Sequence, residues 1–527
     1  MKYEKEINRR KSFAIISHPD AGKTTLTEKL LLFGGAIQTA GAVKSNKIKK
    51  HATSDFMEIE RQRGISVATS VMSFEYKGNL INLLDTPGHK DFAEDTYRTL
   101  TAVDSVILVI DSVNGVEPQT RRLMEVCSMR ATPVIVFINK MDRDGKNRFD
   151  LLEEIEAELK ISLHPMTWPI NSGKEFKGVY NLHDKSLRLF TASTKADDED
   201  VVAIGDLSSP VLQQKVGDRD ADLLREDVEL IDGVYGALNP AEYLSGAIAP
   251  VFFGSAVNNF GVQEMLDTFI QIAPTPRDRE TNMRKVQAGE DKFSGFIFKI
   301  HANLDPKHRD RIAFVRLCSG HFKRGMKLTH VRTKKIMAIA SPMLFLAADR
   351  ELAEEAWAGD IIGIPNHGQL RIGDALTENE ILKFAGIPSF APELLQSVRA
   401  TDPMKAKHLD KALNQFAEEG AAKLFKPVIG AGWIIGVVGA LQFEVLASRI
   451  ELEYGIPVRF EQSQFNSARW LSGEKDEIEK FVNVNKGHMA MDHDGDPVYM
   501  TRLQWDIDRV ERDYPNLNLT STKDIMV

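Results

Sequence analysis

The chain has 527 residues, a formal net charge of −8 and 43% hydrophobic residues. Its length predicts about three domains, and none of its apolar stretches approaches the roughly 18 residues of a membrane-spanning helix. The net negative charge argues against non-specific binding along nucleic acids, because such binding depends on basic side chains that neutralise the phosphates of the nucleic acid. The two cysteines, Cys127 and Cys318, lack metal-site spacing, and a reducing cytoplasm fits them.

The first part of the chain alternates short apolar runs with amphipathic stretches. Runs rich in Val and Ile predict strands at 12–16, 80–85, 105–111, 132–139 and 249–256. The stretches between them predict helices at 23–33, 91–103 and 117–130. Continuous apolar strands that alternate with helices are typical of a doubly wound, mostly parallel sheet. Residues 171–245 break this pattern, so we expect an insertion or subdomain there.

The pattern changes after the polar, Pro-rich linker at 273–280. Short alternating strands with Gly turns predict an antiparallel β-barrel up to about residue 380. Beyond 388, a helix near 403–418 and a helix that ends at Gly455 flank a strand at 433–439, which predicts an α+β domain. We therefore expect three domains, with limits 1–278, 288–382 and 388–527.

A phosphate-binding turn is predicted at 17–24, between the first strand and the first helix. Gly22 would let the backbone approach a phosphate, Lys23 would contact the β- and γ-phosphates, and Thr24 would bind Mg²⁺. The first position holds Ser17 where the usual pattern has glycine, so the motif alone does not exclude an ordinary strand-to-helix turn. The complete set is Ser17, His18, Pro19, Asp20, Ala21, Gly22, Lys23 and Thr24.

Three further motifs follow predicted strands in the same order as in nucleotide-binding sheets. Asp85 is placed to hold the Mg²⁺ shell, and Gly88 to offer its N–H to the γ-phosphate. Asn139 and Asp142 suit the edge of a guanine base, with Lys140 lying against the ring. The motif residues are Asp85, Thr86, Pro87, Gly88 and His89; Asn139, Lys140, Met141 and Asp142; and Ser255 and Ala256. Since ligands bind outside the carboxyl ends of parallel strands, the four motifs together predict a nucleotide site.

These motifs, with RGIS at 63–66, resemble the guanine-nucleotide motifs of translational GTPases. The phosphate loop SHPDAGKT and the segment 54–74 narrow the resemblance to the bacterial peptide chain release factor three family rather than elongation factor G. The resemblance extends through 356–364 and 439–450, over the whole chain. It implies a P-loop GTPase domain, a translation-factor β-barrel and an α+β C-terminal domain.

The resemblance also implies a reaction. GTP would be hydrolysed to GDP by in-line attack of water, with GTP or GDP and Mg²⁺ bound. His89 matches the histidine that orients the water, and Ser66 stands where the family has a metal-binding threonine. The polar segment 40–66 is typical of a switch that becomes ordered with the γ-phosphate.

By the same resemblance, the partners are the ribosome (its RNA and proteins) and the class I release factors. The protein would be a cytoplasmic monomer that drives these factors off the ribosome after peptide release. Two other functions stay open: another ribosomal GTPase, such as a translocase-like or stress factor, and a nucleotide-dependent switch with little hydrolysis.

Overall fold

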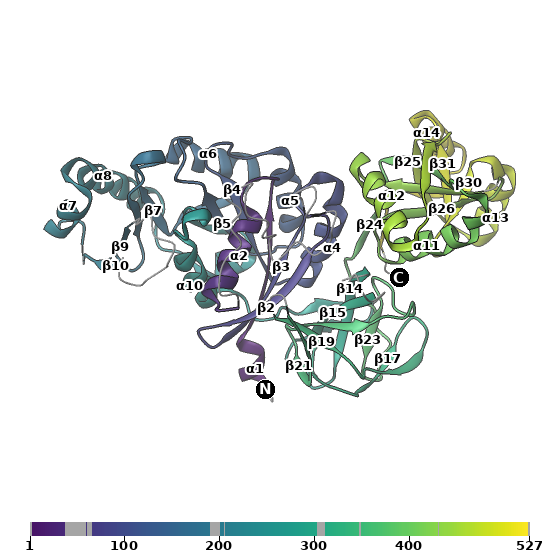
Figure 1. The fold of residues 1–527 in the computed structure, drawn as a ribbon, viewed down its shortest axis with the longest axis horizontal. Coiled ribbons are helices and arrows are strands. Elements are labelled where there is room, and N and C mark those ends of the chain that lie inside the picture. Colours follow the sequence, from purple (N-terminus) through teal and green to yellow (C-terminus); the bar gives the residue numbers. More distant parts are fainter. Residues whose placement is uncertain are drawn as a thin grey trace.

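The structure is a computed structural model that describes residues 3–36, 60, 66–189, 201–204, 206–302, 311–346, 349–430 and 432–524. Figure 1 shows the α/β domain in the centre, a mostly β domain below it and an α+β domain at one end. None of the described helices combines the length and apolar character that a membrane crossing requires.

The N-terminal domain contains the predicted doubly wound sheet. Its strands lie in the order β2-β3-β1-β4-β5-β11-β6, and only the β2–β3 pair is antiparallel. Central β1 has β3 on one side and β4 on the other, so the strand order reverses there, and ligands of such sheets bind outside the carboxyl ends at this point. The strands are β2 (Ser70–Tyr76), β3 (Asn79–Asp85), β1 (Arg10–Ser17), β4 (Ser105–Asp111), β5 (Val134–Asn139), β11 (Ile248–Phe253) and β6 (Ser162–Pro165).

Helices cover both faces of this sheet because its apolar strand residues alternate between two cores. Ile15 and Ile107 pack on the face of α2 (Lys23–Phe33) and α10 (Val262–Ile272). Ile16 and Leu108 pack on the opposite face, with α5 (Pro118–Met129) and α6 (Arg148–Leu159). Successive strand side chains point to opposite faces, so a strand buried on both sides reads as one continuous apolar run.

A small subdomain separates β6 from β11. Its four antiparallel strands lie in the order β10-β9-β8-β7, and its helices α7 and α8 lie at the far end of the molecule from the C-terminal domain (Figure 1). Its elements are β7 (Thr167–Ile170), β8 (Gly178–Asn181), β9 (Ser186–Leu189), β10 (Val201–Ala203), α7 (Pro210–Val216), α8 (Asp218–Val234) and α9 (Pro240–Ser245).

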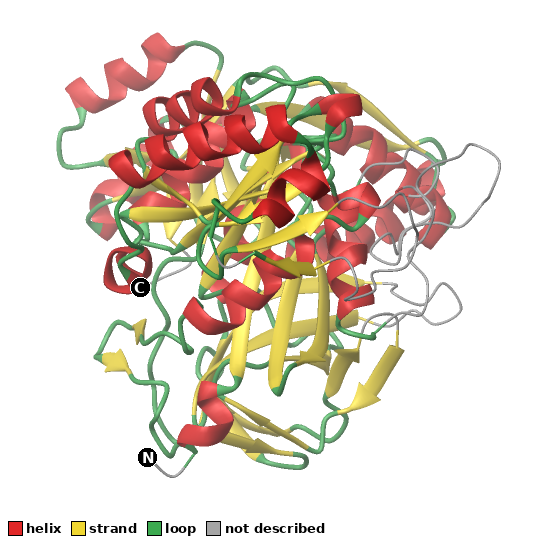
Figure 2. Cartoon of the chain, turned by 90° about the vertical axis from the view of Figure 1, so that its left-hand side faces the viewer, coloured by secondary structure: helices red, strands yellow, loops and turns green. Residues whose placement is uncertain are grey.

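The second domain is built from antiparallel strands around its own apolar core, as predicted. Figure 2 shows strands predominating in this lower part of the molecule, while most helices lie above it. The strands run in the order β18-β17-β23-β14-β15-β22-β19, and β19 joins β2 of the first sheet. They are β14 (Ser294–Ala302), β15 (Arg311–Ser319), β17 (Lys327–His330), β18 (Lys335–Ala338), β19 (Met343–Leu346), β22 (Ile361–Pro365) and β23 (Ala375–Thr377), with β20 (Asp349–Leu352) beside β19 and the pair β16 (His321–Lys323) and β21 (Glu355–Trp357).

The C-terminal domain has an eight-stranded antiparallel sheet with helices, which confirms the predicted α+β class. The strand order is β28-β25-β27-β26-β30-β31-β29-β32. Its main elements are β25 (Leu394–Ala400), α11 (Ala406–Glu418), β26 (Lys423–Pro427), β27 (Trp433–Val437), α12 (Ala440–Tyr454), β28 (Val458–Gln462), β29 (Ser467–Ser472), α13 (Lys475–Val484), β30 (Met489–Asp492), β31 (Pro497–Thr501), α14 (Gln504–Asp513) and β32 (Asn518–Thr520). We keep the limits 1–278, 288–382 and 388–527 as a proposal for the three domains.

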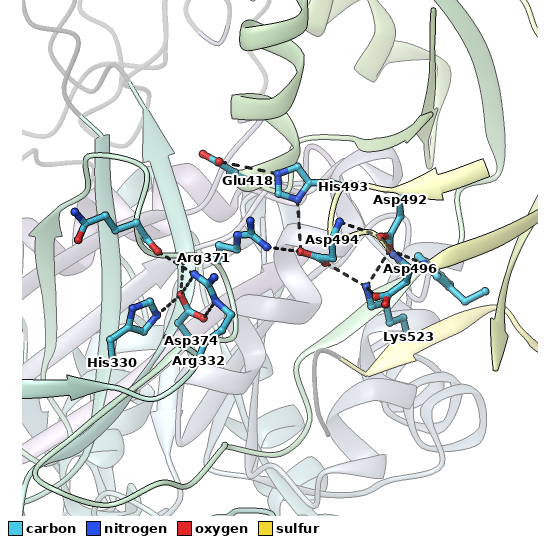
Figure 3. Close-up of polar contacts among 12 residues, drawn as sticks. His330, Arg332, Arg371, Asp374, Glu418, Asp492, His493, Asp494, Asp496 and Lys523 are labelled. Carbon is cyan, nitrogen blue, oxygen red and sulfur yellow. Dashed lines mark hydrogen bonds and ion pairs between the residues drawn. The ribbon is translucent and has the colours of Figure 1, made fainter. Parts of the chain in front are cut away.

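Charged side chains join the second and third domains. Arg371 donates to Asp494 at 2.8 Å across this interface (Figure 3). The Lys523 ammonium lies among the carboxylates of Asp494 and two neighbouring aspartates and supplies their counterion. His493 and Lys523 hold the pKa of Asp494 well below its ordinary range. The Asp494 carboxylate therefore stays ionised and available to Arg371 at neutral pH.

Candidate functional site

The four predicted motifs lie at one edge of the N-terminal sheet. They follow the carboxyl ends of β1, β3, β5 and β11, where the strand order reverses. Asn139 connects three of them: its Nδ2 donates to the Ala21 carbonyl at 2.8 Å, and its Oδ1 accepts from the Ala256 N–H at 2.9 Å. The Met141 N–H also donates to the Gly254 carbonyl at 3.1 Å. The motifs therefore form one connected site.

The phosphate loop has the backbone shape of an anion cradle. Asp20 and Gly22 have φ angles of 62° and 99°, and a Cβ at Gly22 would overlap the Asn139 amide nitrogen. Only glycine fits this position. Gly22 also precedes α2 without a side-chain cap, so the first-turn N–H groups of that helix are left for a ligand.

The first loop position does not require glycine. Ser17 is the last residue of β1, is 1% exposed, and its Oγ donates to the His18 carbonyl at 2.8 Å. The His18 Nε2 lies 3.1 Å from a carboxylate oxygen of Glu117. Pro19 packs against Gly88, where an added Cβ would lie 3.5 Å from the Pro19 Cα. The loop therefore accommodates a side chain at position 17 and contacts the second motif directly.

Lys23 and Asp85 form a buried ion pair at the base of the cradle. Lys23 Nζ lies 2.5 Å from Asp85 Oδ1, and the two side chains are 6% and 1% exposed. The other carboxylate oxygen, Asp85 Oδ2, is buried without a hydrogen-bond partner. An orphaned carboxylate oxygen beside a lysine and an open helix N-terminus suits a hydrated cation and a phosphate. The residues present therefore fit Mg²⁺ and a nucleotide.

The hydroxyl groups predicted to bind Mg²⁺ are half-buried. Thr24 is the second residue of α2, and Ser66 directly precedes buried Val67. The rest of the predicted switch at 40–66 lies outside the described residues, apart from Glu60. The Glu60 carboxylate accepts from the Val67 and Ala68 N–H groups at 2.8 and 3.2 Å, a contact that the sequence analysis did not foresee.

The residues predicted to recognise the base are held by neighbouring side chains. Ser255 Oγ donates to Asp142 Oδ1 at 2.6 Å, so the carboxylate predicted to bind the base has a fixed orientation. The Lys140 ammonium binds Asp111 at 2.6 Å, which leaves its aliphatic stem as the part that can lie against a ring. Asp111 was not among the predicted site residues, although it ends the strand next to β5 and such positions are typical of ligand sites.

The second motif combines buried and accessible residues. Thr86 Oγ1 donates to the Ile15 carbonyl at 2.7 Å, and the Pro87 carbonyl accepts from Thr96 Oγ1 at 3.3 Å. His89 is 34% exposed, and its Nδ1 accepts from the Asp91 N–H at 3.2 Å. This hydrogen bond places the proton of a neutral ring on Nε2. A neutral His89 ring therefore has Nε2–H as the group that would donate to a water once the ring reaches it.

Comparison with protein families decides the identity of the chain. Residues 8–275 match the elongation factor Tu GTP binding domain, just over half of the chain. Residues 292–379 match elongation factor G domain 2, and residues 384–511 match the C-terminal domain of class II release factor RF3. The chain belongs to the translational GTPases of the release factor 3 type. This translational GTPase is a GTP-binding protein of translation termination, and its family acts on the ribosome.

The fold of this translational GTPase is shared by a crystal structure of a protein from Thermus thermophilus. The two have a TM-score of 0.70 and 21% sequence identity, over 89% of this chain and 71% of the other. The likeness confirms the predicted fold class.

Proposed function

We propose that this translational GTPase hydrolyses GTP on the ribosome and uses the cycle to drive class I release factors off after peptide release. The observation that carries the proposal is the order of matches along one chain. A match to the elongation factor Tu GTP binding domain at 8–275 and one to elongation factor G domain 2 at 292–379 are followed at 384–511 by a match to the C-terminal domain of class II release factor RF3. We further propose that it acts as a monomer in the cytoplasm.

The phosphate loop would bind and orient GTP. Residues 17–24 would surround the phosphates with backbone N–H groups, and Lys23 would leave Asp85 to bind the β- and γ-phosphates. Thr24 and Ser66 would hold Mg²⁺, with Asp85 behind them. Bound Mg²⁺ would neutralise charge on the phosphates. The buried Lys23–Asp85 pair supports this exchange, because it holds the lysine in place until a phosphate replaces the carboxylate.

The remaining motifs would select guanine and complete catalysis. The Asp142 carboxylate would accept from the N–H groups of guanine, Asn139 would hold the loop behind the base, and Ser255 and Ala256 would close over it. Gly88 would donate its N–H to the γ-phosphate, and His89 would orient the attacking water once the ribosome repositions it.

The test is multiple turnover of class I release factor on post-termination ribosomes. Wild-type protein with GTP should release the factor repeatedly, while protein with GDP and the Lys23→Ala variant with GTP should not. Absence of ribosome-stimulated GTP hydrolysis would indicate that the protein is a nucleotide-dependent switch with little hydrolysis. Stimulated hydrolysis without factor release would instead indicate another ribosomal GTPase, and preference for ATP would refute the guanine assignment.

A further inference from the structure

Helix α12 of the C-terminal domain has only half of a capping box of its own, in which Gln442 Oε1 accepts from the Gly439 N–H at 3.1 Å. Its N-cap residue is Gly439, which has no side chain. The Leu441 N–H at the second helical position instead donates to Asp91 Oδ2 at 2.9 Å. A side-chain oxygen that accepts from this position is what an N-cap residue normally provides. Asp91, in the GTP-binding domain, therefore caps a helix of another domain.

The contact depends on glycine at position 439. A Cβ there would overlap the Asp91 carboxylate. Gly439 has φ −144° and ψ 158°, an extended conformation that any residue adopts, so its backbone does not require glycine. Space for Asp91 is thus the reason for glycine at this position, and alanine would displace the carboxylate without straining the helix.

Asp91 also restrains His89. The Asp91 N–H donates to His89 Nδ1 at 3.2 Å, and Asp91 Oδ1 lies 3.4 Å from the same nitrogen. Asp91 is 5% exposed, in the 3-10 turn η1 (Lys90–Phe92) that His89 begins. One residue therefore contacts both the histidine proposed to orient water and the N-terminus of α12.

The surrounding packing places α12 beside both nucleotide-sensing segments. Val445 of α12 packs with Phe92, which follows the His89 loop, and with Val67, which follows Ser66. A cavity of about 70 Å³ lies at this junction, lined by residues of all three domains, including Val67, Phe92, Lys299 and Val445.

We propose that Asp91 is a positioning residue through which the docked C-terminal domain restrains His89. While α12 is docked, its N-terminus fixes the Asp91 carboxylate, and the Asp91 backbone fixes the imidazole. Movement of the C-terminal domain withdraws the helix from Asp91 and frees His89 to reach the water. This inference rests on the proposed function, because it concerns the control of the same hydrolysis.

The test breaks the contact from either domain and measures GTP hydrolysis without ribosomes. Asp91→Ala removes the carboxylate, and Gly439→Ala pushes it aside. Both should raise the ribosome-free kcat about fivefold, the factor that loss of one such hydrogen bond implies, and should leave GTP affinity unchanged. Asp91→Asn should give a smaller rise, since its amide oxygen still accepts. A destabilised fold would lower the rate, so a gain separates positioning from damage.

Two further variants show whether the effect passes through this contact. Glu94 and Lys423 form a neighbouring interdomain ion pair at 2.7 Å that does not involve His89. Glu94→Ala removes this pair and should not raise the ribosome-free kcat. His89→Ala combined with Gly439→Ala should abolish the gain. A raised kcat in Glu94→Ala, or a raised kcat that persists without His89, would overturn the proposal. An unchanged or reduced kcat in both Asp91→Ala and Gly439→Ala would also overturn it.

Hydrogen exchange gives a readout that does not depend on activity. Residues 440–443 should exchange faster in Asp91→Ala, and unchanged exchange there would also contradict the proposal. If Asp91→Ala does not fold, the same measurements on Gly439→Ala provide the test. Absence of ribosome-stimulated hydrolysis in the wild type would refute the proposed function. If the wild type is stimulated by ribosomes but Asp91→Ala and Gly439→Ala behave as the wild type, only the positioning role of Asp91 is refuted.

Discussion

Lys23 and Asp85 neutralise each other in the interior of the site, with Nζ and Oδ1 2.5 Å apart. Each is the counterion that allows the other to be buried, because an isolated buried charge is far more costly than a paired one. The pair also defines what a nucleotide must do on binding. In the proposed site, a phosphate would replace the carboxylate as the partner of Lys23 and leave Asp85 free for a cation.

Replacement of Lys23 should therefore affect both binding and stability. In Lys23→Ala, GTP affinity should fall by at least about 100-fold, since charge-assisted contacts to the phosphates are lost. The free energy of unfolding should fall by about 3 kcal/mol, because Asp85 stays buried without its partner. Fluorescent-nucleotide titration and urea unfolding measure these changes. Lys215→Ala, on the exposed surface of α7, should match the wild type; normal GTP affinity in Lys23→Ala would refute the phosphate cradle.

Asp142 should determine the choice of base. In Asp142→Asn the amide oxygen can still accept from Ser255 Oγ, now 2.6 Å from the carboxylate, so the loop should stay in place. The lost carboxylate should weaken GTP binding about 100-fold, while xanthine nucleotides gain affinity because their C2 carbonyl suits an amide donor. Competition between GTP and XTP measures the change. Asp144→Asn, an exposed neighbour, is the control, and continued strong preference for GTP would show that Asp142 does not contact the base.

His89 should matter for catalysis and not for binding. Its Nδ1 is engaged by the Asp91 N–H, so the ring contributes through Nε2. In His89→Ala, ribosome-stimulated kcat should fall about 100-fold or more, the range of positioned proton donors and acceptors, while GTP affinity stays unchanged. Rapid-mixing phosphate release on ribosomes measures the rate. Lys90→Ala alters the exposed neighbour and serves as the control; wild-type turnover in His89→Ala would remove this residue from the mechanism.

The sequence was sufficient for the features that depend on local pattern. Continuous apolar strands predicted the doubly wound sheet, because burial on both faces leaves no polar positions in Ile15–Ile16 or Ile107–Leu108. The order of the nucleotide motifs followed from the same strands. Contacts between domains could not be predicted this way. Asp91 and Leu441 are 350 positions apart, and each looks locally ordinary, a polar loop residue and a first-turn leucine. Their contact exists only because two separately folded units pack together.

The two thiols should be inert in the folded protein. Burial raises the pKa of both Cys127 and Cys318 to about 12, well above their ordinary value. Since the thiolate is the reactive form, neither should react with iodoacetamide at pH 8 until the chain is unfolded. Because the folded-state pKa is raised, stability should be unaffected below the ordinary pKa of about 8.5 and decline as pH rises from there toward 12. Mass spectrometry of labelled peptides measures reactivity, with Lys215→Cys as an exposed positive control; labelling of native Cys127 would contradict its burial.

An ion pair between the first two domains should stabilise the fold over a defined pH range. Lys299 Nζ lies 2.8 Å from Asp95 Oδ2, which also accepts from the Thr69 N–H at 2.7 Å. Burial alone would raise the pKa of Asp95, but Lys299 and Arg98 outweigh it and hold that pKa well below its ordinary range. The stabilisation is therefore present above the ordinary pKa of about 3.9 and is lost as pH falls through the folded-state pKa.

Asp95→Asn should thus lower the free energy of unfolding by about 3 kcal/mol at pH 7, because buried Lys299 loses its counterion. The deficit should be the same at pH 5 and shrink below about pH 4, where Asp95 of the unfolded wild type takes up a proton while the folded carboxylate is still ionised. Adding Lys299→Met should recover most of the loss, since an apolar side chain needs no partner. Urea unfolding at each pH measures the difference. Asp222→Asn, in an exposed pair with Arg225, should change stability by less than about 1 kcal/mol. A deficit that already shrinks between pH 7 and 5 would mean that the pKa of Asp95 is not depressed by this pair.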